Sequence, residues 1–230
     1  MSWREFWNAD TPIYVNDRHK IVHYQRIADD IEKLLPGPDA RVVDYGCGEA
    51  LAAGRVAARC GHLYLCDGAE IVRDRLRQRL AAVANATILS PEDFDTVPDS
   101  SIDLIVVNSL VQYLSKEQLG AYLAQWRRKL RPSGRLVVAD VIPPGIGPLT
   151  DAAALLRFAA ANGFLIASFT GLVRTFFSDY RRVRAQLGLA HYSEAEFLKL
   201  LRDAGFTAER MSWNFGHNAA RMAFEARVSG

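Results

Sequence analysis

The sequence predicts an α/β protein built on a doubly wound, mostly parallel, seven-stranded sheet, with an N-terminal helix and a C-terminal antiparallel hairpin. Two observations support this class. Short apolar runs rich in β-branched residues alternate with segments of helical periodicity between residues 41 and 142, as is typical of a parallel sheet covered on both faces. After residue 205, two runs alternate apolar and polar side chains around "GHN" (216–218), which predicts two antiparallel strands.

Composition limits the domain organisation and the class of partner. The chain has 230 residues, 50% of them hydrophobic, so we expect a single domain over 1–230. Its 28 basic and 26 acidic residues leave a net charge of +2, which gives no bulk attraction to nucleic acid or anionic lipid. Three cysteines without a Cys-x-x-Cys pair favour a reducing cytoplasm over a disulfide framework or zinc ribbon. We expect neither a signal peptide nor a membrane span, because no run reaches the roughly 18 apolar residues required.

The chain up to residue 142 is expected to form one helix and then alternating strands and helices. Apolar side chains recur with the helical period over residues 17–35, and "PGP" (36–38) ends this helix, the main part of an N-terminal helical segment (1–39). Ser115 and Gln118 form a capping box for a later helix. In chain order, the other expected elements are strand 41–45, a helix from about 50 to 60, strand 62–67, a helix with Val72, Leu76, Leu80 and Val83 on one stripe, strands 87–90 and 102–109, the capped helix up to "RPSG" (131–134), and strand 135–142.

The alternation stops after the fifth strand. Residues 143–192 show helical patterning with no strand between them, which predicts a helical insertion. Ser193 and Glu196 then form a second capping box, for a helix that ends at Gly205 ahead of the closing strands.

The first strand leads into a turn, "DYGCGEAL", that has the position of a nucleotide site in such sheets. Gly46 and Gly48 fit a dinucleotide fingerprint, but Leu51 stands where its third glycine is required, which disfavours a nicotinamide oxidoreductase. Asp44 would place a carboxylate under the turn, where it repels a pyrophosphate and attracts an ammonium group. Asp67 ends the second strand, where an acid can accept hydrogen bonds from both ribose hydroxyls. The sequence therefore predicts a nucleoside ligand with a positive amino group.

These residues resemble the class I S-adenosylmethionine-dependent methyltransferases. "VVDYGCGEA" is similar to their first motif, "LYLCD" to the ribose-binding acid, "SPEDF" to the adenine-side loop, "IDLIVVNSLVQYL" to the fourth strand and its loop, and "LRPSGRLVVADV" to the fifth strand. The resemblance covers roughly residues 40–142, and the closing helix and hairpin also match the end of the family fold. It implies a Rossmann-like fold, S-adenosylmethionine as the cofactor, and methyl transfer as the activity.

The resemblance also implies a cofactor site. Asp44 and the glycine turn would hold the methionine part, Asp67 the ribose, and Glu92 or Asp93 with Phe94 the adenine. The candidate cofactor-binding residues are Tyr14, Arg18, Asp44, Gly46, Cys47, Gly48, Asp67, Gly68, Glu92, Asp93, Phe94 and Asn108.

Two of these residues have an alternative role, and two other positions depart from the family motif. Tyr14 and Arg18 lie in a segment that often folds over the cofactor in this family, so they could contact the cofactor carboxylate or close the pocket; the alternative is packing at the surface. Ala50 stands where the motif commonly has glycine, which is tolerable if its φ is negative. Ser90 stands where an acid often begins the adenine loop.

Methyl transfer requires few catalytic side chains, because the sulfonium supplies the leaving group and the enzyme mainly aligns the nucleophile and excludes water. A base is needed only where the acceptor must first lose a proton. His217, expected after the sixth strand on the ligand face, is the candidate base, and the alternative is a turn histidine bonded to backbone. Tyr113, after the fourth strand, is the second catalytic candidate or a pocket wall, and Asp140 could anchor the insertion.

No metal site is expected. His19 and His23 are four residues apart and share a helix face. A zinc-protease pair would need Glu directly after the first histidine, where this chain has Lys20.

The sequence thus predicts a cytoplasmic methyltransferase that acts on an oxygen or nitrogen atom of a small, partly apolar organic acceptor. One alternative is methylation of a lipid or carrier-bound intermediate, and another is a non-catalytic cofactor-binding subunit that docks a partner. The apolar segment 155–184 could be a lid over the acceptor, a homodimer surface or an amphipathic helix that touches a membrane. A lid is preferred, because the segment is too short to span and its basic cluster is small.

Overall fold

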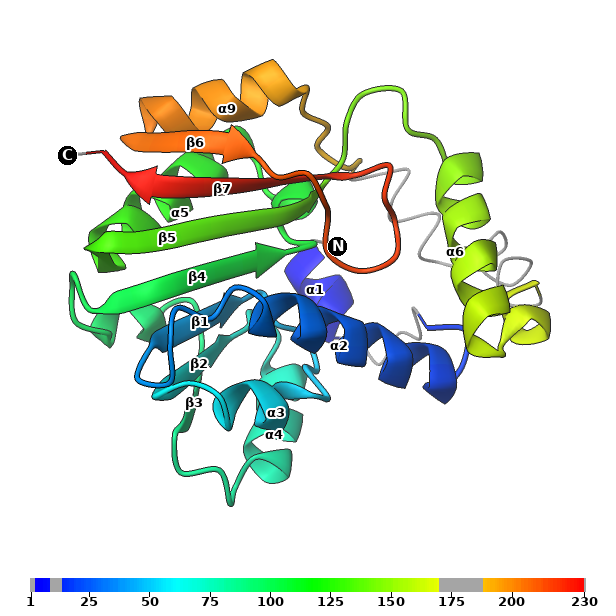
Figure 1. The fold of residues 1–230 in the computed structure, drawn as a ribbon, viewed down its shortest axis with the longest axis horizontal. Coiled ribbons are helices and arrows are strands. Elements are labelled where there is room, and N and C mark those ends of the chain that lie inside the picture. Colours follow the sequence, from blue (N-terminus) through cyan, green and yellow to red (C-terminus); the bar gives the residue numbers. More distant parts are fainter. Residues whose placement is uncertain (1–2, 9–13, 170–187, 230) are drawn as a thin grey trace.

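A computed structural model describes residues 3–8, 14–169 and 188–229. They form a seven-stranded sheet in the order β3-β2-β1-β4-β5-β7-β6 (Figure 1). β7 runs antiparallel to both of its neighbours, whereas the other pairs are parallel, which confirms the predicted fold class. The strands are β1 (Arg41–Tyr45), β2 (His62–Cys66), β3 (Ala86–Leu89), β4 (Ile102–Asn108), β5 (Leu130–Val141), β6 (Phe206–Arg210) and β7 (Met222–Val228).

Helices cover both faces of the sheet. α2, α3 and α4 pack on one face and α5 and α9 on the other, so two hydrophobic cores form. The strands between these cores are apolar on both sides, which explains their continuous hydrophobic runs. The helices are α1 (Trp3–Asn8), α2 (Asp17–Glu32), α3 (Ala53–Ala57), α4 (Glu70–Arg79), α5 (Lys116–Lys129), α6 (Pro148–Asn162) and α9 (Glu194–Asp203), with short 3-10 turns η1 (Asp93–Thr96) and η2 (Val111–Tyr113).

Local capping signals mark the starts of three helices, α2, α5 and α9. Both predicted capping boxes are present, at Ser115 with Gln118 and at Ser193 with Glu196. α2 begins after Asn16, whose side chain accepts a hydrogen bond from the backbone N–H of His19. These caps satisfy backbone donors that a helix start leaves without partners.

Three elements differ from the expectation. α3 has five residues instead of about ten, because the glycine turn before it extends to Ala52. β5 begins at Leu130, which pairs with Ile102 before a register shift, so "RPSG" is part of the strand. β6 ends at Arg210, and residues 211–221 form a wide loop in place of a tight turn at "GHN". The loop is longer than predicted because its residues pack against other elements, and such contacts leave no local pattern in the sequence.

The predicted insertion is helical over α6 and again over residues 165–169, and residues 188–192 form neither helix nor strand. Its part from 170 to 187 lies outside the described residues, as does much of the expected lid, dimer or membrane surface. Figure 1 shows α6 beyond the carboxyl ends of the parallel strands, close to the start of α2. None of the helices in the described part of the chain is long and apolar enough to cross a bilayer.

Candidate functional site

A cavity of about 1260 Å³ lies at the carboxyl ends of the parallel strands. A single drug-sized ligand usually fills a pocket of roughly 300–1,000 Å³, so this cavity has room for two small molecules. Ten of the predicted site residues line it: Tyr14, Asp44, Gly46, Cys47, Gly48, Asp67, Gly68, Asn108, Tyr113 and His217.

The turn after β1 lines this cavity. Gly46 and Gly48 have φ values of +79° and +57°, which an L side chain rarely adopts. A Cβ at Gly48 would lie 2.6 Å from the Tyr24 hydroxyl, so the close approach of α2 also requires glycine there. Ala50 does not meet the condition of a negative φ, because its φ is +37°. The fold holds this alanine in a left-handed conformation at the end of the turn.

Asp44 supplies an unpaired carboxylate beside this turn. It is 6% exposed and lines the cavity, and no described residue forms a hydrogen bond or ion pair with it. Burial, together with the nearby Asp67 carboxylate, raises the pKa of Asp44 to about 7. A buried carboxylate without a partner is costly unless a cation or donor reaches it, so this part of the cavity is suited to a ligand with an ammonium group.

Asp67 links the turn to α4. Its carboxylate accepts hydrogen bonds from the backbone N–H groups of Gly48 at 2.9 Å and Ala69 at 2.8 Å. Burial raises the pKa of this carboxyl group. Each oxygen keeps a further lone pair, so Asp67 can hold the turn and still accept hydrogen bonds from ligand hydroxyls.

Four predicted residues do not line the cavity. The Nε atom of Arg18 donates to the carbonyl oxygen of Asn162 at 2.7 Å, which joins α2 to the end of α6; its contact with the cofactor stays a prediction. Phe94 is fully buried, with its ring edge-on to Tyr45 at 5.3 Å, and its contact with the adenine also stays a prediction. The carboxylate of Asp93 accepts a hydrogen bond from the hydroxyl of Ser90. Glu92 also lies outside the lining, although Pro91 belongs to it.

Sequence reasoning missed Tyr24, which fastens α2 to the glycine turn. Its hydroxyl accepts a hydrogen bond from the backbone N–H of Glu49 at 2.9 Å. An ion pair between Lys20 and Glu49 adds a second connection. The Tyr14 ring lies 5.9 Å from that of Tyr24 and also lines the cavity. The signal available in the sequence was Tyr24 itself, a polar aromatic residue within the apolar stripe of α2.

The same cavity is also lined by the histidine cluster, defined as His19, His23 and His217. The rings of His23 and His217 each lie 6.4 Å from that of His19. Phe164 stacks on His19 at 5.1 Å, and Phe158 stacks on His217 at 4.7 Å. Because the histidines line the cavity and these two phenylalanines do not, the phenylalanines form a second layer behind the cluster.

All three imidazoles of the histidine cluster titrate below their ordinary range. Burial, and then the charge of His217, lowers the pKa of His19 to about 4. Burial, followed by the charges of His19 and His217, lowers the pKa of His23 to about 3. Burial is also the main cause that lowers the pKa of His217, followed by Arg221. The cluster is therefore uncharged at neutral pH. Within the described ranges, no group of three His, Cys, Asp or Glu residues is arranged to hold a metal ion.

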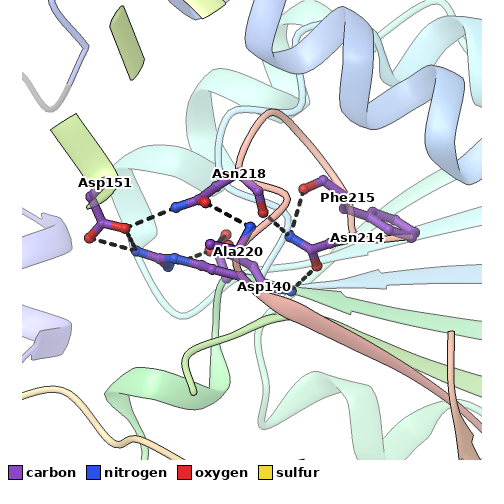
Figure 2. Close-up of polar contacts among 8 residues, drawn as sticks. Asp140, Asp151, Asn214, Phe215, Asn218 and Ala220 are labelled. Atoms are coloured by element: carbon purple, nitrogen blue, oxygen red, sulfur yellow. Dashed lines mark hydrogen bonds and ion pairs between the residues drawn. The ribbon is translucent and has the colours of Figure 1, made fainter. Parts of the chain in front are cut away.

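Arg221, which sequence reasoning also missed, anchors the loop that carries His217. Its guanidinium binds Asp140 at 2.9 Å and Asp151 of α6 at 3.1 Å (Figure 2). The side chain of Asn218 donates to Asp151 at 2.9 Å. Burial raises the pKa of Asp140, although Arg221 and the Ser109 hydroxyl oppose this. Asp140 thus holds the loop through Arg221, and the same guanidinium, not Asp140 itself, contacts α6.

A second set of bonds gives the loop its shape. The Oδ1 atom of Asn214 accepts from the backbone N–H of Asp140 at 2.9 Å, and its Nδ2 donates to the carbonyl groups of Phe215 and Asn218 (Figure 2). The Phe215 ring is buried in the core on the α2 side. His217 is therefore held between the sheet and α6.

Part of the chain matches a known protein family. A family model described as a methyltransferase domain matches residues 42–134. No curated protein matches the chain in a sequence comparison.

Solved structures share the fold at low identity. The magnesium protoporphyrin IX methyltransferase of Synechocystis PCC 6803 with bound SAH has a TM-score of 0.59 at 16% identity, over 99% of this chain and 93% of that chain. A chain in the complex between the Haloferax volcanii Trm112 methyltransferase activator and a methyltransferase has a TM-score of 0.61 at 17% identity, over 100% and 99% of the two chains. The mitomycin 7-O-methyltransferase MmcR has a TM-score of 0.61 at 20% identity, over 99% of this chain and 61% of that chain. Residues 42–134 thus match a methyltransferase domain, and the seven-stranded fold as a whole is that of the class I S-adenosylmethionine-dependent methyltransferases.

Proposed function

We propose that the chain is an enzyme that transfers a methyl group from S-adenosylmethionine to an oxygen or nitrogen atom of a small, partly apolar organic acceptor. The observation that supports this most is the mixed lining of one cavity. The glycine turn and two carboxylates line it, and so do uncharged aromatic and imidazole side chains.

The glycine turn and the two carboxylates suit the family cofactor. Asp44 has a buried carboxylate without a partner among the described residues, which would bind the cofactor ammonium group. Asp67 would accept hydrogen bonds from the ribose hydroxyls, and the glycines would let the backbone approach closely. When bound, the cofactor supplies a methyl group on a positively charged sulfur.

His217 is the proposed general base. Its imidazole is half-buried and lines the cavity, and its lowered pKa keeps a ring nitrogen free to accept a proton at neutral pH. Tyr113 lines the same cavity and contacts the Trp7 ring edge-on at 5.7 Å. It is proposed as a wall that helps to exclude water, with proton transfer as the alternative role.

A lipid or carrier-bound acceptor is the second candidate, because apolar side chains are exposed around the insertion. Leu149 is 86% exposed and Phe169 is 65% exposed. A homodimer through this region would use the same surface. A non-catalytic cofactor-binding subunit is a further alternative, in line with the activator complex of the Haloferax volcanii structure. A cytoplasmic location remains a prediction.

Two measurements test the proposed function. First, S-adenosylmethionine and S-adenosylhomocysteine should each raise the unfolding midpoint of the protein, and NAD should not, because only a ligand that binds the folded state stabilises it. Stabilisation by NAD alone would contradict the cofactor assignment. Second, incubation with a cell metabolite extract and methyl-labelled cofactor should yield a labelled small molecule. Tight cofactor binding with no labelled product from small molecules, lipids or carriers would favour the non-catalytic subunit.

A further inference from the structure

The histidine cluster brings together three imidazoles from two distant parts of the chain. His19 and His23 lie on α2, and His217 lies in the loop between β6 and β7. The Tyr14 ring contacts both α2 histidines, at 5.4 Å and 5.6 Å. These four aromatic rings line one part of the cavity, so a flat ligand can pack against them.

Adjacent positive charges are unfavourable in this setting. His19 is 7% exposed, and its neighbours in the cluster lie only 6.4 Å away between ring centres. Two imidazolium ions at that spacing, poorly solvated, would repel each other strongly. A neutral imidazole offers one hydrogen-bond donor and one acceptor, and no net charge. The cluster therefore provides hydrogen bonding and stacking without attraction for an anion.

The charged side chains near the cluster already have partners. Arg221 binds both Asp140 and Asp151, so its positive charge is compensated by two carboxylates. The nearby Arg26 is exposed and donates to the carbonyl oxygen of Gly216. Within the described part of the chain, a buried carboxylate or phosphate on a ligand would therefore find no free counter-charge here, and a buried ammonium would find Asp140 occupied.

Of the other charged residues that line the cavity, Asp44 precedes the glycine turn, Asp67 accepts a hydrogen bond from it, and Lys116 is exposed in the first turn of α5. None of these three residues belongs to the histidine cluster. An uncharged ligand suits the cluster better than an ion does.

We propose that the methyl acceptor is an uncharged planar aromatic compound and that its reacting group is a phenol-type hydroxyl held by the histidine cluster. This inference rests on the proposed function and narrows it from any oxygen or nitrogen atom to one class of oxygen. The imidazoles and Tyr14 pack against the aromatic ring, and a free ring nitrogen of His217 accepts the hydroxyl hydrogen. In the transfer, the acceptor oxygen forms a bond to the methyl carbon, and the carbon–sulfur bond breaks with its electron pair left on sulfur. The hydroxyl proton passes to His217.

Three probes of matched shape test the proposal: 2-naphthol, 2-naphthoic acid and 2-(aminomethyl)naphthalene. At pH 7.5 they are neutral, anionic and cationic. Binding is measured by calorimetry on protein saturated with S-adenosylhomocysteine, and methylation by mass spectrometry with S-adenosylmethionine. We expect 2-naphthol to bind at least about tenfold more tightly than the two ions, because an unpaired charge is costly to bury, and to be the probe that is methylated. Preference for either ion, or binding of none of the three, would overturn the proposal.

Variants separate the cluster from the rest of the site. His23→Phe keeps an aromatic ring and removes the hydrogen-bonding groups, so it should weaken 2-naphthol binding several-fold and leave S-adenosylhomocysteine binding unchanged. His62→Phe is the matched control, because that imidazole contacts the Thr87 hydroxyl outside the cavity; it should change neither affinity. Equal 2-naphthol affinity in His23→Phe and the wild type would overturn the role of the cluster. Failure of S-adenosylhomocysteine to bind the wild type would instead contradict the proposed function itself.

Discussion

The Ser109 hydroxyl donates a 2.6 Å hydrogen bond to the Asp140 carboxylate, and both residues have positive φ values, +55° and +62°. Ser109 directly follows β4, and Asp140 is the penultimate residue of the neighbouring parallel strand β5. Both residues line the cavity. Left-handed backbone at a non-glycine residue costs roughly 1–3 kcal/mol and persists where surrounding contacts determine it. Here the hydrogen bond and the ion pair with Arg221 supply those contacts.

Two substitutions at Ser109 separate the hydrogen bond from the strain. Ser109→Ala loses a bond to a charged group and keeps the positive φ, so it should lower the free energy of unfolding by about 1.5–3 kcal/mol. Ser109→Gly loses the same bond but relieves the backbone, and should be more stable than Ser109→Ala by about 1 kcal/mol. Urea denaturation measures both. A glycine variant no more stable than the alanine variant would show that the positive φ carries no strain.

Asp67→Ala should weaken cofactor binding by roughly 1–3 kcal/mol, the usual effect of losing a charged hydrogen-bond partner. It also removes the carboxylate that binds the N–H groups of Gly48 and Ala69, so circular dichroism must confirm that the variant is folded. Calorimetry with S-adenosylhomocysteine gives the affinity. Asp74→Ala, an exposed acid of α4 paired with Arg77, is the control and should bind like the wild type. Unchanged affinity in Asp67→Ala would exclude Asp67 from the site.

Asp44 should make cofactor binding depend on pH. Its pKa in the free protein is raised to about 7, so the carboxylate that would bind the ammonium group is partly protonated at neutral pH. The affinity for S-adenosylhomocysteine should increase between pH 6 and pH 7.5, with release of a proton on binding. In Asp44→Asn the affinity should be lower and should change less with pH. A wild-type affinity that is constant over this range would contradict the linkage.

The raised pKa of Asp44 also predicts how the stability of the free protein depends on pH. The folded pKa of about 7 lies above the unfolded value of about 3.9, so between these limits the folded state holds a proton that the unfolded state has lost. Folding is therefore favoured as pH falls from 8 to 5, with a slope of at most about 1.4 kcal/mol per pH unit from this group. Urea titrations of wild type and Asp44→Asn without ligand should differ by this slope. Parallel pH profiles for the two proteins would remove Asp44 as its source.

His217→Ala should lower turnover and leave cofactor affinity nearly unchanged. A general base contributes on the order of 10²–10⁴ in rate. The wild-type rate should fall on acidification only below the ordinary imidazole range, because the pKa of His217 is lowered by burial and Arg221. Steady-state rates with the acceptor, together with a cofactor binding isotherm, measure both effects. Full activity in the variant would assign proton removal to Tyr113, Asp140 or solvent.

Most of the fold could be predicted from the sequence, because its signals are local. Buried parallel strands need continuous apolar runs, and both capping boxes need only four adjacent residues. The glycine turn was recognisable because Gly46 and Gly48 have backbone conformations that other residues rarely adopt. Asp44 and Asp67 followed from their positions at or near strand ends, since parallel strands bring these ends to one edge of the sheet.

The tertiary structure alone decided the rest, because those contacts join residues far apart in sequence. Arg18 donates a hydrogen bond to Asn162, 144 positions later, and does not line the cavity. His19 meets His217 across about 200 residues, and Arg221 finds Asp140 and Asp151 on two other elements. A periodic pattern shows which face of an element is buried, but not which element covers it. The sequence by itself therefore determined the strands, the glycine turn and the two acids beside it, whereas long-range packing decided which other side chains line the cavity with them.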